Sequence, residues 1–463
     1  MSASNQSLLN QLLSKDLTYT YHCSPFIKRL FEADKALEQF SLQHISHPFS
    51  RQEMESWLDG RQISDEISLN KSLRILRQQV IANIILRDLN KLADLDEVLK
   101  SVTALAEITL IHAHQFHFNA LKSIHGSPIG LRGEEQQLSI VGMGKLGGEE
   151  LNVSSDIDLI FAYPEEGDTE SKDSISNQSF FIKLCKKIIS SLNDVTEDGF
   201  VFRVDMQLRP FGSEGQIVCS YQMLEDYYQK YGREWERYAW VKGRVIVGPQ
   251  IELSQIIEPF VYRKYLDYGA LNSMRDLKTQ IQNDVNKKGI QENIKVGRGG
   301  IRKIEFIAQV YQLIRGGQDK TLRLKSLLPA LALLVTKNLL SKNGVKSLTE
   351  AYKFLRNLEH RLQYMEDMQT QELPKTDEGK LRVVQSMHYQ DWNMFYQDLE
   401  IHRANVEFYF DEVFKETIKD QDSPQLNSTK ALWNNTLSLE DAHKHLESLG
   451  FKLTGETYQV IDG

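Results

Sequence analysis

Cysteine is scarce in this chain of 463 residues, with three widely spaced copies at Cys23, Cys185 and Cys219. An odd number of distant thiols supports neither a disulfide framework nor a zinc site, so we expect reduced and mostly packed side chains. Long apolar runs are missing too, and the first residues form neither a basic segment nor a long hydrophobic one. The composition therefore predicts a cytoplasmic protein without a membrane span.

An excess of positive charge is also absent. Lysine and arginine number 55 against 63 aspartates and glutamates, which leaves a formal net charge of −8. Proteins that bind nucleic acid need a basic surface, so we expect no nucleic-acid substrate. A chain this long exceeds a single hydrophobic core and predicts about two to four structural units.

Two aspartates one residue apart form the most informative pattern in the chain. The segment 138–161 reads as an apolar strand, a glycine-rich turn and a second apolar strand that carries Asp156 and Asp158. Side chains two positions apart on a strand point the same way, so the two carboxylates share a face. Two like charges placed together call for a shared proton or a bound cation. The pattern predicts a divalent metal site.

The turn before these acids has the composition of a phosphate-binding loop. Its glycines allow the backbone to curl tightly and to point amides at a polyphosphate, and Lys145 adds a point charge. A site with two metal ions needs a third acid. Alternation of polar and apolar residues over 201–209 predicts a half-buried strand with Asp205 on its polar face, flanked by Arg203 and Arg209. Together these features predict metal-assisted nucleotidyl transfer.

Periodicity predicts helix, then mixed α/β structure, then helix again. The α/β part includes a helix at 176–193 and, after the Asp205 strand, a helical stretch over 225–246. A heptad-like apolar seam over 347–365 predicts helical packing. We therefore expect a mostly α protein with an embedded mixed α/β nucleotidyltransferase-fold domain and a C-terminal helical bundle. The expected divisions are 1–135 (N-terminal helical region), 136–265 (catalytic domain), 266–420 (bundle) and 421–463 (linker or truncated start of a further region).

Three weaker patterns accompany the acids. The run His112, His114 and His117 lacks an acid or cysteine at ligand spacing and favours ordinary helix histidines. The segment 232–239 fits a solvated stripe of salt bridges and an active-site flank equally well. The segment 297–315 predicts a glycine-rich entry to a helix, whose N-terminus attracts anions.

Five segments resemble, in order and spacing, the glutamine synthetase adenylyltransferase/adenylyl-removing enzyme family. The resemblance covers residues from about 70 to 420. The segments are GMGKLGGEELNVSSDIDLIF at 142–161, RVDMQLRPFG at 203–212, GREWERYA at 232–239, GGIRKIEF at 299–306 and QTQELP at 369–374.

The resemblance implies a function for this chain. The family's full-length protein resembles two nucleotidyltransferase halves in tandem, and this sequence is similar to the N-terminal, adenylyl-removing half. That half implies phosphorolysis: inorganic phosphate attacks the AMP–tyrosine bond of adenylylated glutamine synthetase and releases ADP. The other half would add AMP from ATP. Mg²⁺, as two ions, or Mn²⁺ in its place, and the PII signal protein are the implied cofactor and further partner.

The resemblance also assigns roles residue by residue. It implies that the metal ligands and catalytic acids are Asp156, Asp158 and Asp205. It further implies a nucleotide- and phosphate-binding set that comprises Gly144, Lys145, Gly147, Gly148, Ser155, Arg209, Arg237, Arg302 and Glu305. The family usually has an acid where this chain has Lys303, so we expect reduced activity and a higher turnover after Lys303→Glu.

Two alternatives remain open from the sequence. The chain could transfer AMP to another protein or small acceptor, which would consume ATP and label the acceptor. It could instead be a catalytically weak regulatory module that binds glutamine synthetase and PII, a reading that Lys303 favours.

Overall fold

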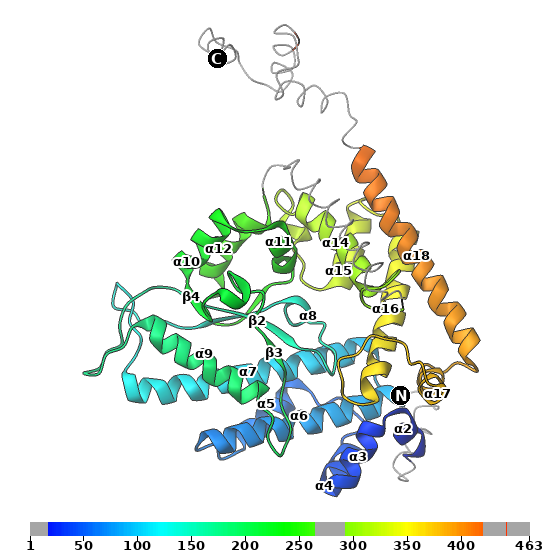
Figure 1. The fold of residues 1–463 in the computed structure, drawn as a ribbon, viewed down its shortest axis with the longest axis horizontal. Helices are drawn as coiled ribbons and strands as arrows, with labels where there is room; N and C mark the ends of the chain where they lie inside the picture. The colour runs from blue at the N-terminus through cyan, green and yellow to red at the C-terminus, as the bar shows by residue number, and fades with distance from the viewer. Residues whose placement is uncertain (1–16, 264–291, 420–440, 442–463) are drawn as a thin grey trace. The chain divides into compact units, whose positions relative to one another are not determined.

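A computed structural model describes residues 17–263, 292–419 and 441 (Figure 1). The predicted linker from residue 421 onward lies almost entirely outside the described residues, as does the start of the predicted bundle. By its internal contacts the chain divides into two compact units, residues 1–406 and residues 407–463. The proposed divisions at 135/136 and 265/266 stay predictions. No helix in the described ranges is both long and apolar enough to cross a membrane.

The first part is helical, as predicted. Its two long helices pack against each other, and each begins at an aspartate whose side chain accepts a backbone N–H of the first turn. Leu73, Leu76, Val80 and Ile84 of the first long helix recur at three- and four-residue spacing and are fully buried or nearly so, so they form its inner face. The helices are α2 (Thr18–Cys23), α3 (Pro25–Ala33), α4 (Lys35–Gln43), α5 (Arg51–Asp59), α6 (Glu66–Leu89) and α7 (Leu95–His125).

A small mixed sheet follows. Its strands are β1 (Ser139–Gly142), β2 (Ile157–Tyr163), β3 (Val204–Asp205), β4 (Val218–Ser220) and β5 (Arg244–Val247). The sheet has the order β3-β2-β1-β5, and β4 also pairs with β2. β1 is antiparallel to β2 and β5, whereas β2 is parallel to β3 and β4. The short helix α8 (Gly144–Gly147) joins β1 to the segment before β2.

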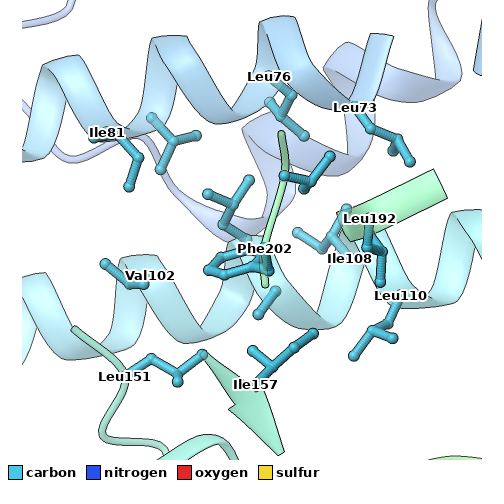
Figure 2. Close-up of a cluster of buried hydrophobic side chains, with 14 of the residues drawn as sticks. Leu73, Leu76, Ile81, Val102, Ile108, Leu110, Leu151, Ile157, Leu192 and Phe202 are labelled. Carbon is cyan, nitrogen blue, oxygen red and sulfur yellow. The ribbon is translucent and has the colours of Figure 1, made fainter. Parts of the chain in front are cut away.

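The main core lies between this sheet and the long helices. The helix α9 (Asn177–Asn193), within one residue of its predicted bounds, packs against α7 and α6. Figure 2 shows the side chains that fill the space, among them Leu76 of α6, Ile108 of α7 and Phe202 ahead of β3. Burying such apolar surface is the dominant favourable contribution to folding, and here it fixes the sheet on a helical base. All three cysteines are free and buried, as predicted.

Two predictions about this region are wrong. The residues 201–209 form a strand only at Val204–Asp205, because the backbone N–H of Gln207 turns back to the Asp205 carboxylate, 2.7 Å away. The helical stretch predicted over 225–246 ends at Val241, and its last residues form β5 instead. Gly243 follows the helix end, and the β-branched run after it pairs with β1.

The remaining described elements are helical. Between the strands lie η1 (Gly212–Glu214), α10 (Tyr221–Lys230) and α11 (Glu234–Val241), and after β5 come α12 (Gln250–Val261), α14 (Ile301–Arg315), η2 (Lys320–Leu322), α15 (Leu327–Thr336), α16 (Lys342–Tyr364), α17 (Asp377–Ser386) and α18 (Trp392–Lys419). α14, α15 and α16 pack against one another, and the predicted apolar seam of α16 is buried. A bundle over the full predicted range 266–420 stays a prediction.

Candidate active site

The sheet brings the predicted acids to one edge. Asp158 on β2 lies directly opposite Asp205 on the parallel strand β3. Asp156 stands just before β2, and its carboxylate accepts a hydrogen bond from Arg203 at 2.5 Å. Arg203 also donates to the backbone carbonyl of Ser154 at 2.7 Å, so its guanidinium ties the acid to the loop that precedes it.

Asp158 is the acid whose charge is least favourable in this setting. Burial, together with the neighbouring charges of Asp205 and Asp156, raises the pKa of its carboxyl to about 6, while Lys295 and Lys145 act in the opposite direction. A carboxylate in this position is stabilised when a cation binds, because the cation offsets the repulsion between the paired acids.

These acids open onto a cavity of about 330 Å³. Eight of the residues predicted from sequence line it: Gly144, Lys145, Ser155, Asp156, Asp158, Asp205, Arg302 and Glu305. The other lining residues were not predicted as site residues: Tyr238, Ala239, Lys242, Lys295, Gln309, Gln363, Gln369 and Gln371. The cavity therefore has carboxylates on one sheet edge, several lysines and an arginine, and a group of side-chain amides.

Lys145 extends into the cavity from α8, and an acidic residue of α16 fixes its position. Its ammonium contacts both carboxylate oxygens of Glu359 on α16, at 2.9 and 3.1 Å. Burial lowers the pKa of Lys145 to about 8, although Glu359 pulls it upward. The same pairing, together with Arg356, keeps the pKa of Glu359 far below its ordinary value, so this carboxyl stays ionised.

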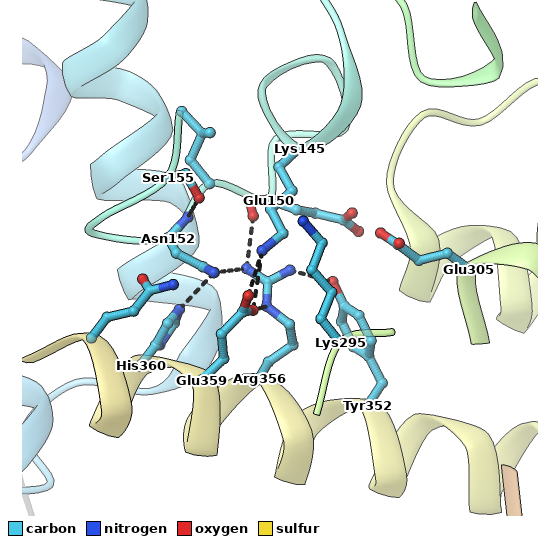
Figure 3. A network of polar contacts seen from close by, with 12 residues as sticks. Lys145, Glu150, Asn152, Ser155, Lys295, Glu305, Tyr352, Arg356, Glu359 and His360 are labelled. Carbon is cyan, nitrogen blue, oxygen red and sulfur yellow. Dashed lines mark hydrogen bonds and ion pairs between the residues drawn. The ribbon is translucent and has the colours of Figure 1, made fainter. Parts of the chain in front are cut away.

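A buried network links α16 to the loop between α8 and β2 (Figure 3). Arg356 donates to the Tyr352 hydroxyl at 2.8 Å, to the backbone carbonyl of Glu150 at 2.7 Å and to the side chain of Asn152. His360 makes a hydrogen bond with the same amide oxygen at 3.1 Å, and burial lowers its pKa to about 3, so it is neutral. The helix predicted only as a packing seam thus fixes the site loop.

Lys242 forms a second buried junction. Its ammonium lies 2.7 Å from Glu150 and 2.6 Å from Glu305 of α14. The two carboxylates overcome the cost of burial and raise the pKa of Lys242, while its charge helps to lower the pKa of Glu305 to about 2. Glu305 is therefore an ionised partner of Lys242 on the cavity wall.

Four predicted residues do not line the cavity. A Cβ on Gly147 would lie 1.8 Å from the carbonyl of Lys242, and the carbonyl of Gly148 accepts from Ser326 at 2.8 Å. Arg209 donates to backbone carbonyls on both sides of it in the chain, those of Met206, Ser213 and Gly215. Arg237 is 2% exposed and bonds to Glu234 and the carbonyl of Val261. Only Gly144 and Lys145 of the predicted glycine loop face the cavity.

The structure also places the weaker sequence patterns: the segment 232–239, the histidines of α7 and Lys303. The segment 232–239 flanks the cavity, because Tyr238 and Ala239 line it, whereas Arg237 is buried and does not. His114 and His117 lie on α7, where burial lowers the pKa of each to about 4. Lys303 on α14 is 6% exposed and does not line the cavity. An effect of Lys303→Glu on turnover would thus act through the packing of α14.

The donor chemistry of the acids suits a hard divalent cation. Asp158 and Asp205 offer adjacent carboxylate oxygens, which Mg²⁺ prefers as ligands. Across the described ranges, no three histidine, cysteine or acidic side chains are clustered closely enough to hold an ion by themselves. At this edge of the sheet the Asp156 carboxylate is paired with Arg203. The three acids remain the predicted metal ligands.

Comparison with known proteins identifies the family. Residues 14–256 match the glutamate-ammonia ligase adenylyltransferase family, and residues 275–414 match the GlnD PII-uridylyltransferase family. The chain is 44% identical to the bifunctional glutamine synthetase adenylyltransferase/adenylyl-removing enzyme of Nitrosomonas eutropha over 95% of its length, and 45% and 47% identical to those of Aromatoleum aromaticum (95%) and Chromobacterium violaceum (89%). These matches cover 49%, 46% and 46% of the relatives, so the chain spans about half their length. The chain belongs to the glutamate-ammonia ligase adenylyltransferase family.

Proposed function

We propose that this chain removes AMP from adenylylated glutamine synthetase by phosphorolysis. The observation that carries the proposal is the cavity in which Asp158 and Asp205 stand beside Lys145, Lys242 and Arg302, an arrangement of acids and cations suited to phosphoryl chemistry. The names of the bifunctional relatives include both the addition and the removal of the adenylyl group. The motif sequences of this chain resemble those of the adenylyl-removing half. Phosphorolysis is therefore proposed over ATP-dependent transfer.

The proposed reaction balances without a further reactant. An oxygen of hydrogen phosphate attacks the phosphorus of the AMP–tyrosine diester, the bond from phosphorus to the tyrosine oxygen breaks, and ADP forms. The proton of hydrogen phosphate ends on the tyrosine oxygen. Total charge is unchanged, since the diester and hydrogen phosphate together carry the same negative charge as ADP.

The residues of the cavity divide this work. Lys145 and Arg302 neutralise the incoming phosphate, whose approach to an anionic diester is otherwise opposed by repulsion. Glu359 holds Lys145 at a fixed place, and Glu305 does the same for Lys242. Ser155 lies on the same wall, and its hydroxyl accepts the backbone N–H of Asn152 at 3.1 Å, which orders the turn ahead of the acids.

Asp156, Asp158 and Asp205 would hold the metal in this scheme. A bound Mg²⁺ supplies a positive charge that polarises the phosphoryl oxygens and orients the reacting groups. The other charges in the cavity come from side chains of this protein. Arg203 neutralises Asp156 in the structure described here, so the acid that lies outside the strand pairing has a cationic partner of its own.

The test is deadenylylation by the purified chain. Adenylylated glutamine synthetase, Mg²⁺ and inorganic phosphate are mixed with the chain, and ADP formation is followed over time. We expect ADP and unmodified glutamine synthetase to appear together, and neither to appear with Asp158→Asn. Consumption of ATP with labelling of an acceptor protein would contradict the proposal, as would a folded chain that forms no ADP.

We extend the proposal to a protein partner, PII. The support is the match of residues 275–414 to a family named for its action on PII. Purified PII titrated into the chain in a calorimeter should give a saturable signal. Absence of any signal at high micromolar concentrations would remove PII from the account without affecting the catalytic proposal.

A further inference from the structure

The QTQELP segment, for which the sequence suggests no role, lies at the wall of the cavity. Gln369 and Gln371 both line it, and the segment is fixed in place because the carbonyl of Gln371 accepts the backbone N–H of Ile294 at 3.0 Å. Asn293 adds a hydrogen bond to Glu372 at 2.9 Å. Lys295, which follows Ile294 in the sequence, also lies on the cavity wall.

Two more glutamines complete a group of uncharged amides. Gln309 comes from α14, and Gln363 comes from α16, one helical turn beyond Glu359. We call these four side chains, Gln309, Gln363, Gln369 and Gln371, the amide wall. Within the described residues, the side-chain amides of Gln309, Gln369 and Gln371 make no hydrogen bond to protein.

Gln363 is the member whose position argues most for a ligand. It is 1% exposed, its Oε1 accepts the backbone N–H of Ser154 at 3.3 Å, and its Nε2 has no hydrogen-bond partner in the described part of the chain. The hydroxyl of Tyr238, a residue of the same cavity that is 8% exposed, also lacks a partner there. Buried polar atoms are usually paired in native structures, so these two unpaired atoms on one cavity wall are available to a polar ligand.

We propose that the amide wall is a nucleobase subsite that selects adenine over guanine. The choice of adenine rests on the proposed function. A carboxamide presents a donor and an acceptor side by side, which match the N6 amine and ring nitrogen of adenine in a bidentate pair. The corresponding edge of guanine offers two acceptors, O6 and N7, and leaves the amide oxygen without a donor. The phosphates then extend toward the lysines and Arg302.

The test is a comparison of ADP and GDP binding to the full chain by calorimetry in the presence of Mg²⁺. We expect ADP to bind at least about tenfold more tightly, which corresponds to one good bidentate pair. The double variant Gln309→Leu/Gln371→Leu should lose most of this preference. Both side chains are half-buried and make no structural hydrogen bond, so the variant should stay folded.

A reciprocal variant and a control sharpen the experiment. Gln371→Glu keeps the shape but only accepts hydrogen bonds, so it should weaken ADP and favour GDP, whose N1–H and N2 amine are donors. Gln52→Leu removes an exposed glutamine from α5, remote from the cavity wall, and should change neither affinity. Equal binding of ADP and GDP by the unaltered chain, or a preference that survives the double variant, would overturn the proposal.

The deadenylylation assay separates this inference from the proposed function. A chain that removes AMP but keeps its base preference in the double variant refutes the amide wall and leaves the function standing. A chain that cannot remove AMP, yet binds ADP through the amide wall, refutes the function and leaves an adenine-specific site.

Discussion

At the scale of single residues, the carboxyl of Asp158 is the group in the cavity whose protonation matters most. Its charge is disfavoured by burial and by the facing Asp205, so the same group that a cation would stabilise is a local source of instability without one. A functional acid of this kind is expected to lower the stability of the fold that carries it.

The first prediction follows for Asp158→Asn. We expect loss of AMP removal together with a rise in melting temperature of roughly 2 °C in metal-free buffer at pH 7.5. Because the folded pKa of about 6 lies above the ordinary value, the penalty is fully present above pH 6 and disappears as pH falls toward 4. Thermal melts at pH 4 and pH 7.5 measure this difference. Equal melting temperatures for both proteins at pH 7.5 would show that the acid is not strained.

The second prediction concerns Lys145. Since its pKa is about 8, the ammonium that we propose neutralises phosphate is lost as pH rises through that value, and activity should fall there. Glu359 raises the pKa of Lys145, so Glu359→Gln should move the alkaline limb of the rate profile to lower pH. The measurement is the initial rate of ADP formation from pH 6 to pH 10. If the alkaline limb of the rate profile does not move in Glu359→Gln, Lys145 does not take part in the reaction.

At the scale of elements, α16 connects packing to the site. Its outward residues form ordinary surface pairs, whereas two residues are fully buried: Arg356 holds the loop between α8 and β2, and Glu359 holds Lys145 of α8. Removing one member of a buried ionic network leaves the other uncompensated, which costs far more than losing a surface pair.

The third prediction uses this contrast within one helix. Arg356→Met should lower the free energy of unfolding by about 3–5 kcal/mol, because Glu359 loses a cation and the loop loses its anchor. Lys346→Ala, which removes an exposed pair with Glu350, should change it by less than about 1 kcal/mol. Denaturant unfolding of both variants gives the comparison. Similar values for the two variants would contradict the role given to the network.

The sequence predicts some elements well and others poorly for physical reasons. Local periodicity placed α9 within one residue, and the apolar–acidic alternation placed Asp158 on a strand. The strand β5 was missed because it has only four residues, too few for a clear alternation, and because it is stabilised by pairing with the distant strand β1. The extent of β3 was overestimated because alternation does not reveal the turn that the Asp205 carboxylate makes with Gln207.

The site shows the same division between local and distant information. The acids, Lys145 and Glu305 could be found from motifs. Lys242 and Gln363 could not be found in this way, because they reach the cavity from α-helical regions whose arrangement depends on the whole fold. Arg209 and Arg237 have the chemistry of phosphate ligands, but their hydrogen bonds are to nearby backbone and side-chain groups. Residue type alone does not separate these uses.

At the scale of the molecule, the regions matched by the two family models are joined by buried contacts. Arg361 on α16 pairs with Asp88 on α6, and Arg77 pairs with Asp367 at 2.7 Å. The hydroxyl of Ser24 donates to the carbonyl of Tyr364 at 2.5 Å. These contacts lie within the single compact unit that ends at Val406.

The fourth prediction is cooperative unfolding of that unit. We expect one main calorimetric transition for the regions 17–263 and 292–406, since breaking their contacts leaves charges such as Asp88 buried without a partner. A fragment that ends at residue 263 should accordingly expose apolar surface and bind a hydrophobic dye. Two well-separated transitions, or a stable fragment, would show that the regions fold independently.

Transfer of labelled phosphate distinguishes phosphorolysis from every other route of AMP release. Adenylylated glutamine synthetase is incubated with the chain, Mg²⁺ and inorganic phosphate labelled at phosphorus, and the nucleotide product is isolated. Phosphorolysis places the label in the β-phosphate of ADP, one for each AMP removed, and Asp158→Asn yields no labelled product. Release of unlabelled AMP would mean hydrolysis, and retention of AMP on glutamine synthetase by a folded, nucleotide-binding chain would contradict the proposed reaction altogether.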